Sequence, residues 1–67
     1  MRIFFNKEVT ELDGKASLFS VLESKGLHSR KGVAVAVNNE VISKSSWEIF
    51  NLKEADQVTV ITATQGG

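Results

Sequence analysis

The feature that most limits what this chain can fold into is its size, because it has 67 residues and no cysteine to cross-link them. At this length folding buries only about 60% of the surface that the unfolded chain exposes, and such small domains often need disulfides or a metal. A hydrophobic share of 42% makes a thin core feasible without either. We therefore predict a single domain over residues 1–67, stabilised by burial and hydrogen bonding.

The composition of the chain and its first residues exclude several classes of partner and site. Eight Lys and Arg residues balance eight Asp and Glu residues, so the chain lacks the positive field that attracts nucleic acid or an anionic membrane. Its first residues lack the charged start and long apolar stretch of a signal peptide, which predicts a cytoplasmic protein. With no cysteine and one histidine, the side chains offer no thiolate for covalent sulfur transfer and no thiol ligands for an iron–sulfur cluster or structural zinc. We therefore expect no bound metal or cofactor.

Five segments have the alternating or β-branched pattern of strands, namely residues 2–6, 8–12, 33–37, 41–42 and 57–62. Asn6 and Lys7 suit a tight turn within the first pair, and residues 38–40 suit one within the second. Residues 57–62 form the most β-like run and should be the central strand.

One helix and one short helical turn are expected between these strands. Ser17 can cap a helix whose apolar face is formed by Leu18, Val21 and Leu22, and Gly26 suits the left-handed position that ends it. Ser45 and Glu48 have the spacing of a capping box, which predicts a helical turn around Trp47, Ile49 and Phe50. This order of elements indicates an α+β fold in which the helix covers one face of a mixed sheet.

The C-terminal segment is expected to be a flexible tail over residues 63–67. No charged side chain occurs from Gln57 to Gly67, and the last residues are small or polar. The four residues 64–67 reach roughly 13 Å when extended, enough to enter a partner's active site. Gly66 and Gly67 lack Cβ atoms, so the backbone can pass a narrow channel.

The tail predicts chemistry at the C-terminal carboxyl group of Gly67. An α-carboxyl group with a pKa of about 3.3 to 3.7 is ionised at neutral pH, and a carboxylate is a poor electrophile. Adenylation by ATP would give a mixed anhydride, and attack by a sulfur nucleophile would then leave an acyl sulfur species on Gly67. This strategy splits one difficult step into two easier ones.

Four segments carry a resemblance to a known family. They are Ile3-Phe4-Phe5-Asn6, then Gly32-Val33-Ala34-Val35-Ala36-Val37-Asn38 followed by Val41-Ile42, then Trp47, and finally Asp56-Gln57-Val58 followed by Gly66-Gly67. The chain resembles, over essentially its whole length, the thiamin-biosynthesis sulfur carrier family of small ubiquitin-like β-grasp proteins. Two departures are Ala55, where the family usually has glycine, and Ala63-Thr64-Gln65 before the diglycine.

The resemblance implies a mixed sheet of four to five strands, with one main helix packed on one face and a short second helical turn. It implies that a ubiquitin-activating-like adenylyltransferase uses ATP to adenylate Gly67, that sulfur is installed there as a thiocarboxylate, and that thiazole synthase receives it. Thr64, Gln65 and Gly66 would enter the partner's active site with Gly67. The chain would be a co-substrate rather than an enzyme, and a monomer when free.

The resemblance also indicates a docking surface for these partners. If the first and last strands are adjacent and parallel, Ile3, Phe5, Val58 and Val60 face the helix, while Phe4 and Ile61 face outward. We expect Phe4 and Ile61 to form, together with Ala34 or Ala36, an exposed apolar patch beside the tail.

Three other functions remain open on the sequence. The chain could carry sulfur for molybdopterin synthesis or tRNA thiolation, with the same chemistry at Gly67. It could be a ubiquitin-like modifier whose terminal glycine is joined to a lysine. It could also be an interaction domain with an inert end, in which case deleting Gly67 would leave its function unchanged.

Overall fold

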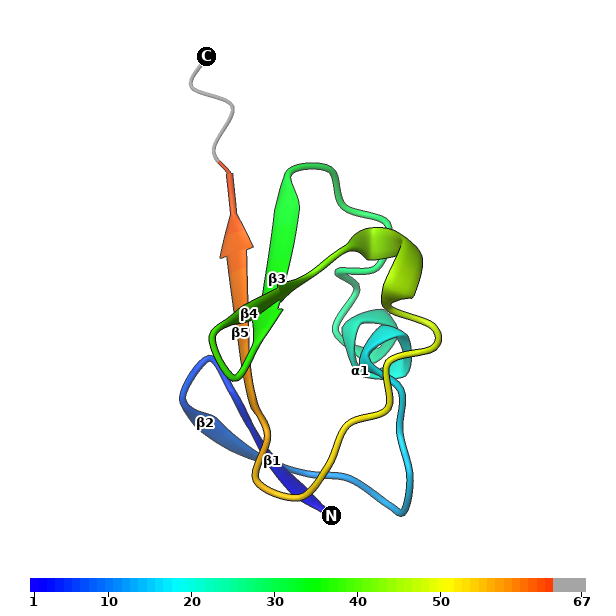
Figure 1. The fold of residues 1–67 in the computed structure, drawn as a ribbon, viewed down its shortest axis with the longest axis vertical. Helices are drawn as coiled ribbons and strands as arrows, with labels where there is room; N and C mark the ends of the chain where they lie inside the picture. Colours follow the sequence, from blue (N-terminus) through cyan, green and yellow to red (C-terminus); the bar gives the residue numbers. More distant parts are fainter. Residues whose placement is uncertain (64–67) are drawn as a thin grey trace.

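The architecture is built on one five-stranded mixed sheet. A computed structural model describes residues 1–63, and Figure 1 shows their course. The elements are β1 (Arg2–Phe5), β2 (Glu8–Glu11), α1 (Leu18–Ser24), β3 (Val33–Val37), β4 (Glu40–Ile42), the 3₁₀ turn η1 (Lys44–Ser46) and β5 (Gln57–Thr62). The strand order is β2-β1-β5-β3-β4, with β1 and β5 parallel and the other pairs antiparallel. The expected β-grasp fold is confirmed, and β5 is the central strand.

Both hairpins turn on two residues with positive φ, as the right-handed twist of the strands requires. Asn6 and Lys7 have φ values of 49° and 72°, and Asn38 and Asn39 have values of 51° and 69°. Asparagine tolerates this left-handed region better than most residues, so the two Asn-led turns specify where the strands reverse. Both predicted turns are confirmed in place, but the second is shorter than predicted, because Glu40 already belongs to β4 and pairs with Val37.

The helix α1 begins and ends where the sequence predicts. The Ser17 hydroxyl accepts a hydrogen bond from the N–H of Ser20 at 3.1 Å. At the other end Gly26 has a φ of +72°, and the Leu27 N–H donates to the Leu22 carbonyl at 2.8 Å. This is a Schellman ending, which satisfies carbonyls that would otherwise lack partners. Within residues 1–63, no helix has the length and apolar character needed to cross a membrane.

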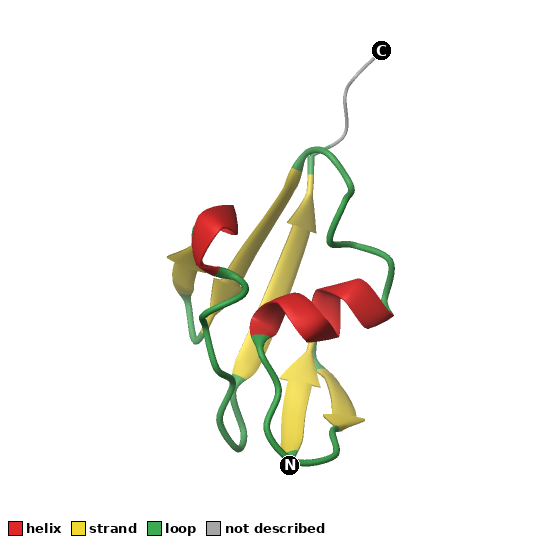
Figure 2. Ribbon diagram, turned by 90° about the vertical axis from the view of Figure 1, so that its right-hand side faces the viewer, coloured by secondary structure: helices red, strands yellow, loops and turns green. Residues whose placement is uncertain are grey.

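The core lies between α1 and one face of the sheet. Figure 2 is viewed from this side and shows α1 lying across the front of the sheet. Alternation along the strands directs every second side chain to this face. The buried apolar side chains are Ile3, Phe5, Leu18, Val21, Leu22, Val35, Val37, Ile42, Trp47, Leu52 and Val58. Val60 is partly buried against them. The predicted inward direction of alternate residues in β1 and β5 is therefore confirmed.

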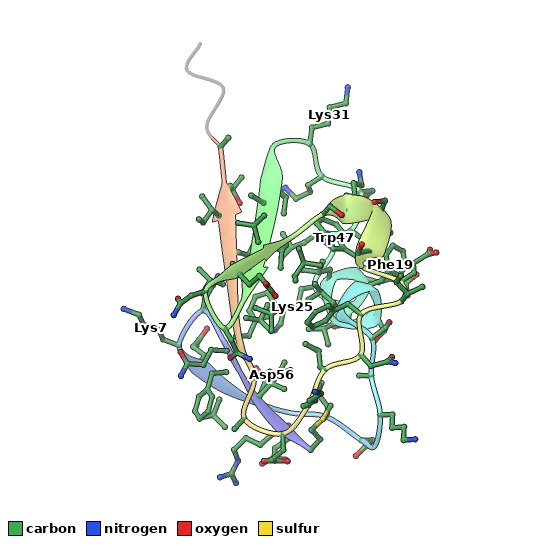
Figure 3. The ribbon with its side chains drawn as sticks, in the orientation of Figure 1. Lys7, Phe19, Lys25, Lys31, Trp47 and Asp56 are labelled. Carbon is green, nitrogen blue, oxygen red and sulfur yellow. The ribbon has the colours of Figure 1, made fainter. Side chains whose placement is uncertain are left out.

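The predicted capping box at Ser45 and Glu48 is wrong. The helical turn is η1, which spans Lys44–Ser46, so Ser45 lies inside it and Ser43 precedes it without a side-chain cap. The turn begins early because Trp47 must enter the core immediately after β4. Trp47 is 2% exposed, and its Nε1–H donates to the Ile42 carbonyl at 3.0 Å. Figure 3 shows Trp47 between η1 and α1.

Candidate functional site at the end of the central strand

The predicted chemical site follows the central strand of the sheet. Gly67, together with Thr64, Gln65 and Gly66, lies outside the described residues. Of the expected tail only Ala63 is described, and its N–H donates to the Gly32 carbonyl at 2.7 Å. The β3–β5 ladder therefore extends one residue beyond β5, which places Ala63 beside the residue before β3; Figure 1 shows the end of β5 next to the start of β3.

Gly32 is a residue whose role at this point the sequence reasoning missed. Its φ is +74°, and a Cβ atom at this position would lie 3.3 Å from the Ala63 carbonyl oxygen. A left-handed conformation and a close backbone approach are the two conditions that favour glycine. The signal in the sequence was a glycine immediately before an alternating strand, but its contact with Ala63 depends on the antiparallel β3–β5 register.

The outer face of the sheet is uncharged where β5 ends. Ile61 pairs with Ala34, and Ala36 pairs with both Thr59 and Val41, so these side chains share the face opposite α1. Ile61 is 61% exposed and Val41 is 75% exposed. Exposed apolar side chains grouped in this way are typical of a protein contact surface. We call Ile61, Ala34, Ala36 and Val41 the outer patch.

Phe4 does not belong to the outer patch, which corrects one expectation. Because β1 and β5 are parallel, Phe4 pairs with Gln57, the first residue of β5, whereas Ile61 lies four residues further along. This separation is about 13 Å along the strand. Phe4 is half-buried and lines a shallow hollow with Lys7 and Gln57. The expected position of Phe4 beside the C-terminal tail is therefore wrong.

Ion pairs and clusters of metal ligands are sparse in the described part of the chain. The ion pair found within residues 1–63 joins Arg2 Nε to Glu11 Oε1 at 3.0 Å, and both side chains are largely exposed. Such a pair contributes little to stability, and it lies on the β1–β2 hairpin, away from the end of β5. Residues 1–63 bring no three His, Asp or Glu side chains together in a way that could hold a metal ion.

A polar network holds the other end of β5. The Asn38 Nδ2–H donates to Asp56 Oδ1 at 2.9 Å, and Asn38 Oδ1 accepts from the Gln57 N–H at 3.0 Å. Asp56 Oδ2 accepts from the Lys53 N–H at 2.7 Å, and Asp56 is only 8% exposed. These bonds attach the β3–β4 turn to the loop before β5. Asn38 and Asp56 therefore support the strand that carries the tail and lie far from its C-terminal end.

Ala55, next to this network, has a backbone conformation that suits glycine better. Its φ is +70°, and its N–H donates to the Arg2 carbonyl at 2.7 Å. The left-handed region costs a residue with a Cβ atom about 1–2 kcal/mol. Replacing Ala55 with glycine would remove this cost. Part of the gain in stability is offset by the larger entropy of glycine in the unfolded chain. We expect Ala55→Gly to raise the free energy of unfolding by about 1 kcal/mol, measured by urea denaturation.

Ala36→Gly is the matched control for Ala55→Gly, because Ala36 lies in the regular strand β3. Glycine in a strand interior is destabilising by about 0.5–1 kcal/mol, so the two changes should have opposite signs. A lower midpoint for Ala55→Gly than for the wild-type chain would contradict the assignment of strain to this residue.

Comparison with known proteins agrees with this arrangement. The family model described as the ThiS family matches residues 3–67. The crystal structure of a thiamine biosynthesis protein (ThiS) from Geobacter metallireducens has a TM-score of 0.83 and 22% sequence identity, covering 100% of both chains. The solution structure of a thiamine biosynthesis protein from the same organism has a TM-score of 0.77 and 22% identity, covering 100% of this chain and 88% of that one. These two likenesses show a shared fold.

A search of curated proteins finds no match. The family model, in contrast, spans nearly the whole chain, including the pattern from the opening strand to the terminal glycines. The chain therefore belongs to the ThiS family of thiamin-biosynthesis sulfur carriers.

Proposed function

We propose that this chain carries sulfur as a thiocarboxylate on Gly67 and donates it, in the cytoplasm, to thiazole synthase. The observation that carries the proposal is the direct connection between the central strand and the diglycine end. β5 is supported on both sides at its start, and it continues through Ala63 into four residues that include Gly66 and Gly67. The folded body can therefore remain outside a partner while the end of the chain enters it. The ThiS family match supports the same function.

The proposed reaction begins at the Gly67 carboxylate. A carboxylate oxygen attacks the α-phosphorus of ATP, pyrophosphate leaves, and an acyl adenylate is formed on an adenylating partner. Hydrosulfide then attacks the acyl carbon, AMP leaves, and Gly67 is left as a thiocarboxylate after loss of a proton. The chain contributes the acyl group and its delivery, whereas ATP is bound by the partner. The chain is thus a co-substrate, and every catalytic group belongs to its partners.

The outer patch is the surface that we propose docks on these partners. Its members Ile61, Ala34 and Ala36 lie next to the strand end from which the tail leaves. Since residues 64–67 span roughly 13 Å at most, a partner that reaches Gly67 must come close to Ala63. An uncharged, exposed face at this point suits close packing of the partner.

Intact-mass spectrometry tests the proposed function directly. The chain is incubated with ATP, a sulfide source and a candidate adenylating enzyme, and a mass increase equal to exchange of one oxygen for sulfur is expected. The control omits ATP. Addition of thiazole synthase and its other substrates should then return the chain to its original mass as thiazole forms. An unchanged mass, or isopeptide-linked adducts in its place, would refute the sulfur-carrier assignment.

The outer patch is tested in the same assay by Ile61→Asp. A charge at this exposed position should lower the rate of thiocarboxylate formation about tenfold by weakening docking, while the thermal midpoint stays close to that of the wild-type chain. Val9→Asp is the matched control, because Val9 is 59% exposed on the same face and pairs with Phe4. Equal rates for the two variants would show that docking does not use the outer patch.

A further inference from the structure

The last part of β5 has a neighbouring strand on one side only. On its β1 side, pairing stops at Phe5 and Val58, because the chain turns away at Asn6 and Lys7. On its β3 side, pairing continues to Thr62, and Ala63 adds a further bond. Figure 1 shows β5 running on beyond the end of β1. The β1 side of β5 is therefore an open edge from Val60 onward.

Hydrogen bonds between β5 and its neighbours identify the backbone groups that face this edge. The Val58 carbonyl accepts from the Asn6 N–H at 2.8 Å, and the Val60 N–H donates to Asn6 Oδ1 at 2.8 Å. Even-numbered residues of β5 thus direct their backbone groups toward β1, whereas Ala63 directs its N–H toward Gly32. By this alternation the Val60 carbonyl and both backbone groups of Thr62 face the open side. Within residues 1–63 no strand lies there to pair with them.

This edge lacks the features that usually prevent strand pairing. Natural sheets protect their edges with charged side chains, proline, bulges or a covering segment. Residues 60–63 are Val-Ile-Thr-Ala, with no charge and no proline. The Asn6 side chain accepts a hydrogen bond from the Val60 N–H, but it does not cover the Val60 carbonyl or the backbone groups of Thr62. Thr62 is exposed, so its N–H is accessible to a second chain.

We propose that the open edge of β5 at residues 60–62 pairs with an extended segment of the adenylating enzyme that takes Gly67. The inference rests on the proposed function, because the short length of the tail brings the enzyme that binds Gly67 close to this edge. A partner that reaches Gly67 must lie within roughly 13 Å of Ala63, which is one residue beyond the open groups of Thr62. Main-chain pairing at such an edge provides affinity and also aligns the peptide that follows. Strand addition would thereby direct residues 64–67 into the active site.

Amide hydrogen exchange measured by NMR on the isotopically labelled chain is the first test. In the free chain the Thr62 amide should exchange fast and the Ala63 amide slowly, because of these two amides only that of Ala63 has a bond within residues 1–63, to the Gly32 carbonyl. Addition of the unlabelled adenylating enzyme should slow exchange at Thr62 at least tenfold and leave Ala63 nearly unchanged. Fast exchange at Thr62 in the complex would overturn the proposal. Slow exchange in the free chain, with the mass of a dimer, would also overturn it by assigning the edge to a second copy.

Thr62→Pro is the second test, because proline removes the Thr62 N–H, which points to the open edge and, within residues 1–63, has no partner there. The β3 ladder does not use this N–H, and edge strands tolerate proline, so the fold should be retained. We expect affinity for the adenylating enzyme to fall at least tenfold. Thr62→Val is the matched control, since it changes the side chain and keeps the N–H, and its affinity should match that of the wild-type chain. If the proline variant does not fold, the exchange experiment decides.

The two proposals can fail separately. If the wild-type chain acquires sulfur and Thr62→Pro binds and reacts equally well, the edge proposal is wrong and the sulfur-carrier function stands. If the wild-type chain acquires no sulfur and does not bind the adenylating enzyme, both proposals are wrong.

Discussion

Deletion of Gly67 is expected to abolish thiocarboxylate formation, with a fall in rate of more than 100-fold. The shortened chain still ends in a glycine carboxylate, Gly66, so the chemical group is retained while its reach is reduced by about 3.5 Å. Displacement of a reacting atom by as little as 1 Å can cost about 100-fold in rate. The expected loss of rate thus comes only from the changed position of the terminal carboxylate. The measurement is intact mass over time with ATP, a sulfide source and the adenylating enzyme.

The fold should not change in the shortened chain. The core is formed by residues from Ile3 to Val58, and Ala63 is the last residue bonded to the sheet in the described part of the chain. Equal urea midpoints for the two chains would confirm this. Thr64→Ala is the matched control, because it alters the tail and keeps its length, and it should retain most of the wild-type rate. A shortened chain that acquires sulfur at the wild-type rate would contradict the requirement for reach and with it the role of Gly67.

Features that depend on neighbouring residues were predicted well from the sequence. The alternation in residues 33–37 and 57–62 defines strands, because the side chains of a strand alternate between two faces. Ser17 and Gly26 define the ends of α1 through short-range hydrogen bonds. These signals lie within a few residues of the structure that they specify, and the resemblance to a known family added the parallel pairing of β1 with β5.

Features that depend on register between distant segments were not predicted. Asn38 was predicted only as part of a turn, and its side-chain partner Asp56 lies 18 residues away. The bond from the Val60 N–H to Asn6 joins residues 54 apart, and it defines where the open edge begins. Phe4 was placed on the correct face and at the wrong end of β5, because alternation determines the face but not the register. The position of Gly67 itself stays a prediction.

The early start of η1 shows the same limit for a helical turn. Ser45 and Glu48 have the spacing of a capping box, but the burial of Trp47 decides where the chain turns. Backbone carbonyls after η1 accept hydrogen bonds from the first turn of α1. The Phe19 N–H donates to the Trp47 carbonyl at 3.0 Å, and the Leu18 N–H donates to the Phe50 carbonyl at 2.8 Å. The segment after η1 therefore satisfies the first N–H groups of α1, a role that capping residues usually fill.

Replacing Trp47 with alanine is expected to unfold a large part of the molecules at 25 °C. Removal of a buried tryptophan costs about 3–5 kcal/mol, while the core of so small a domain rarely supplies more than about 3–5 kcal/mol. Trp47 is 2% exposed, and it bonds both the Ile42 carbonyl and, through its own carbonyl, the start of α1. The loss should appear in circular dichroism and in a urea midpoint close to zero.

Two further variants separate the causes of this loss. Trp47→Phe keeps most of the ring packing and removes the Nε1–H, so the Ile42 carbonyl loses its partner and stability should fall by about 1–3 kcal/mol. Ile49→Ala is the control in the same segment, because Ile49 is 78% exposed and its loss should cost no more than about 0.5 kcal/mol. If Trp47→Ala unfolds at the same urea concentration as Ile49→Ala, the tryptophan is not the anchor of this side of the core. In that case the bonds to α1 must be held by the backbone of residues 47–50 alone.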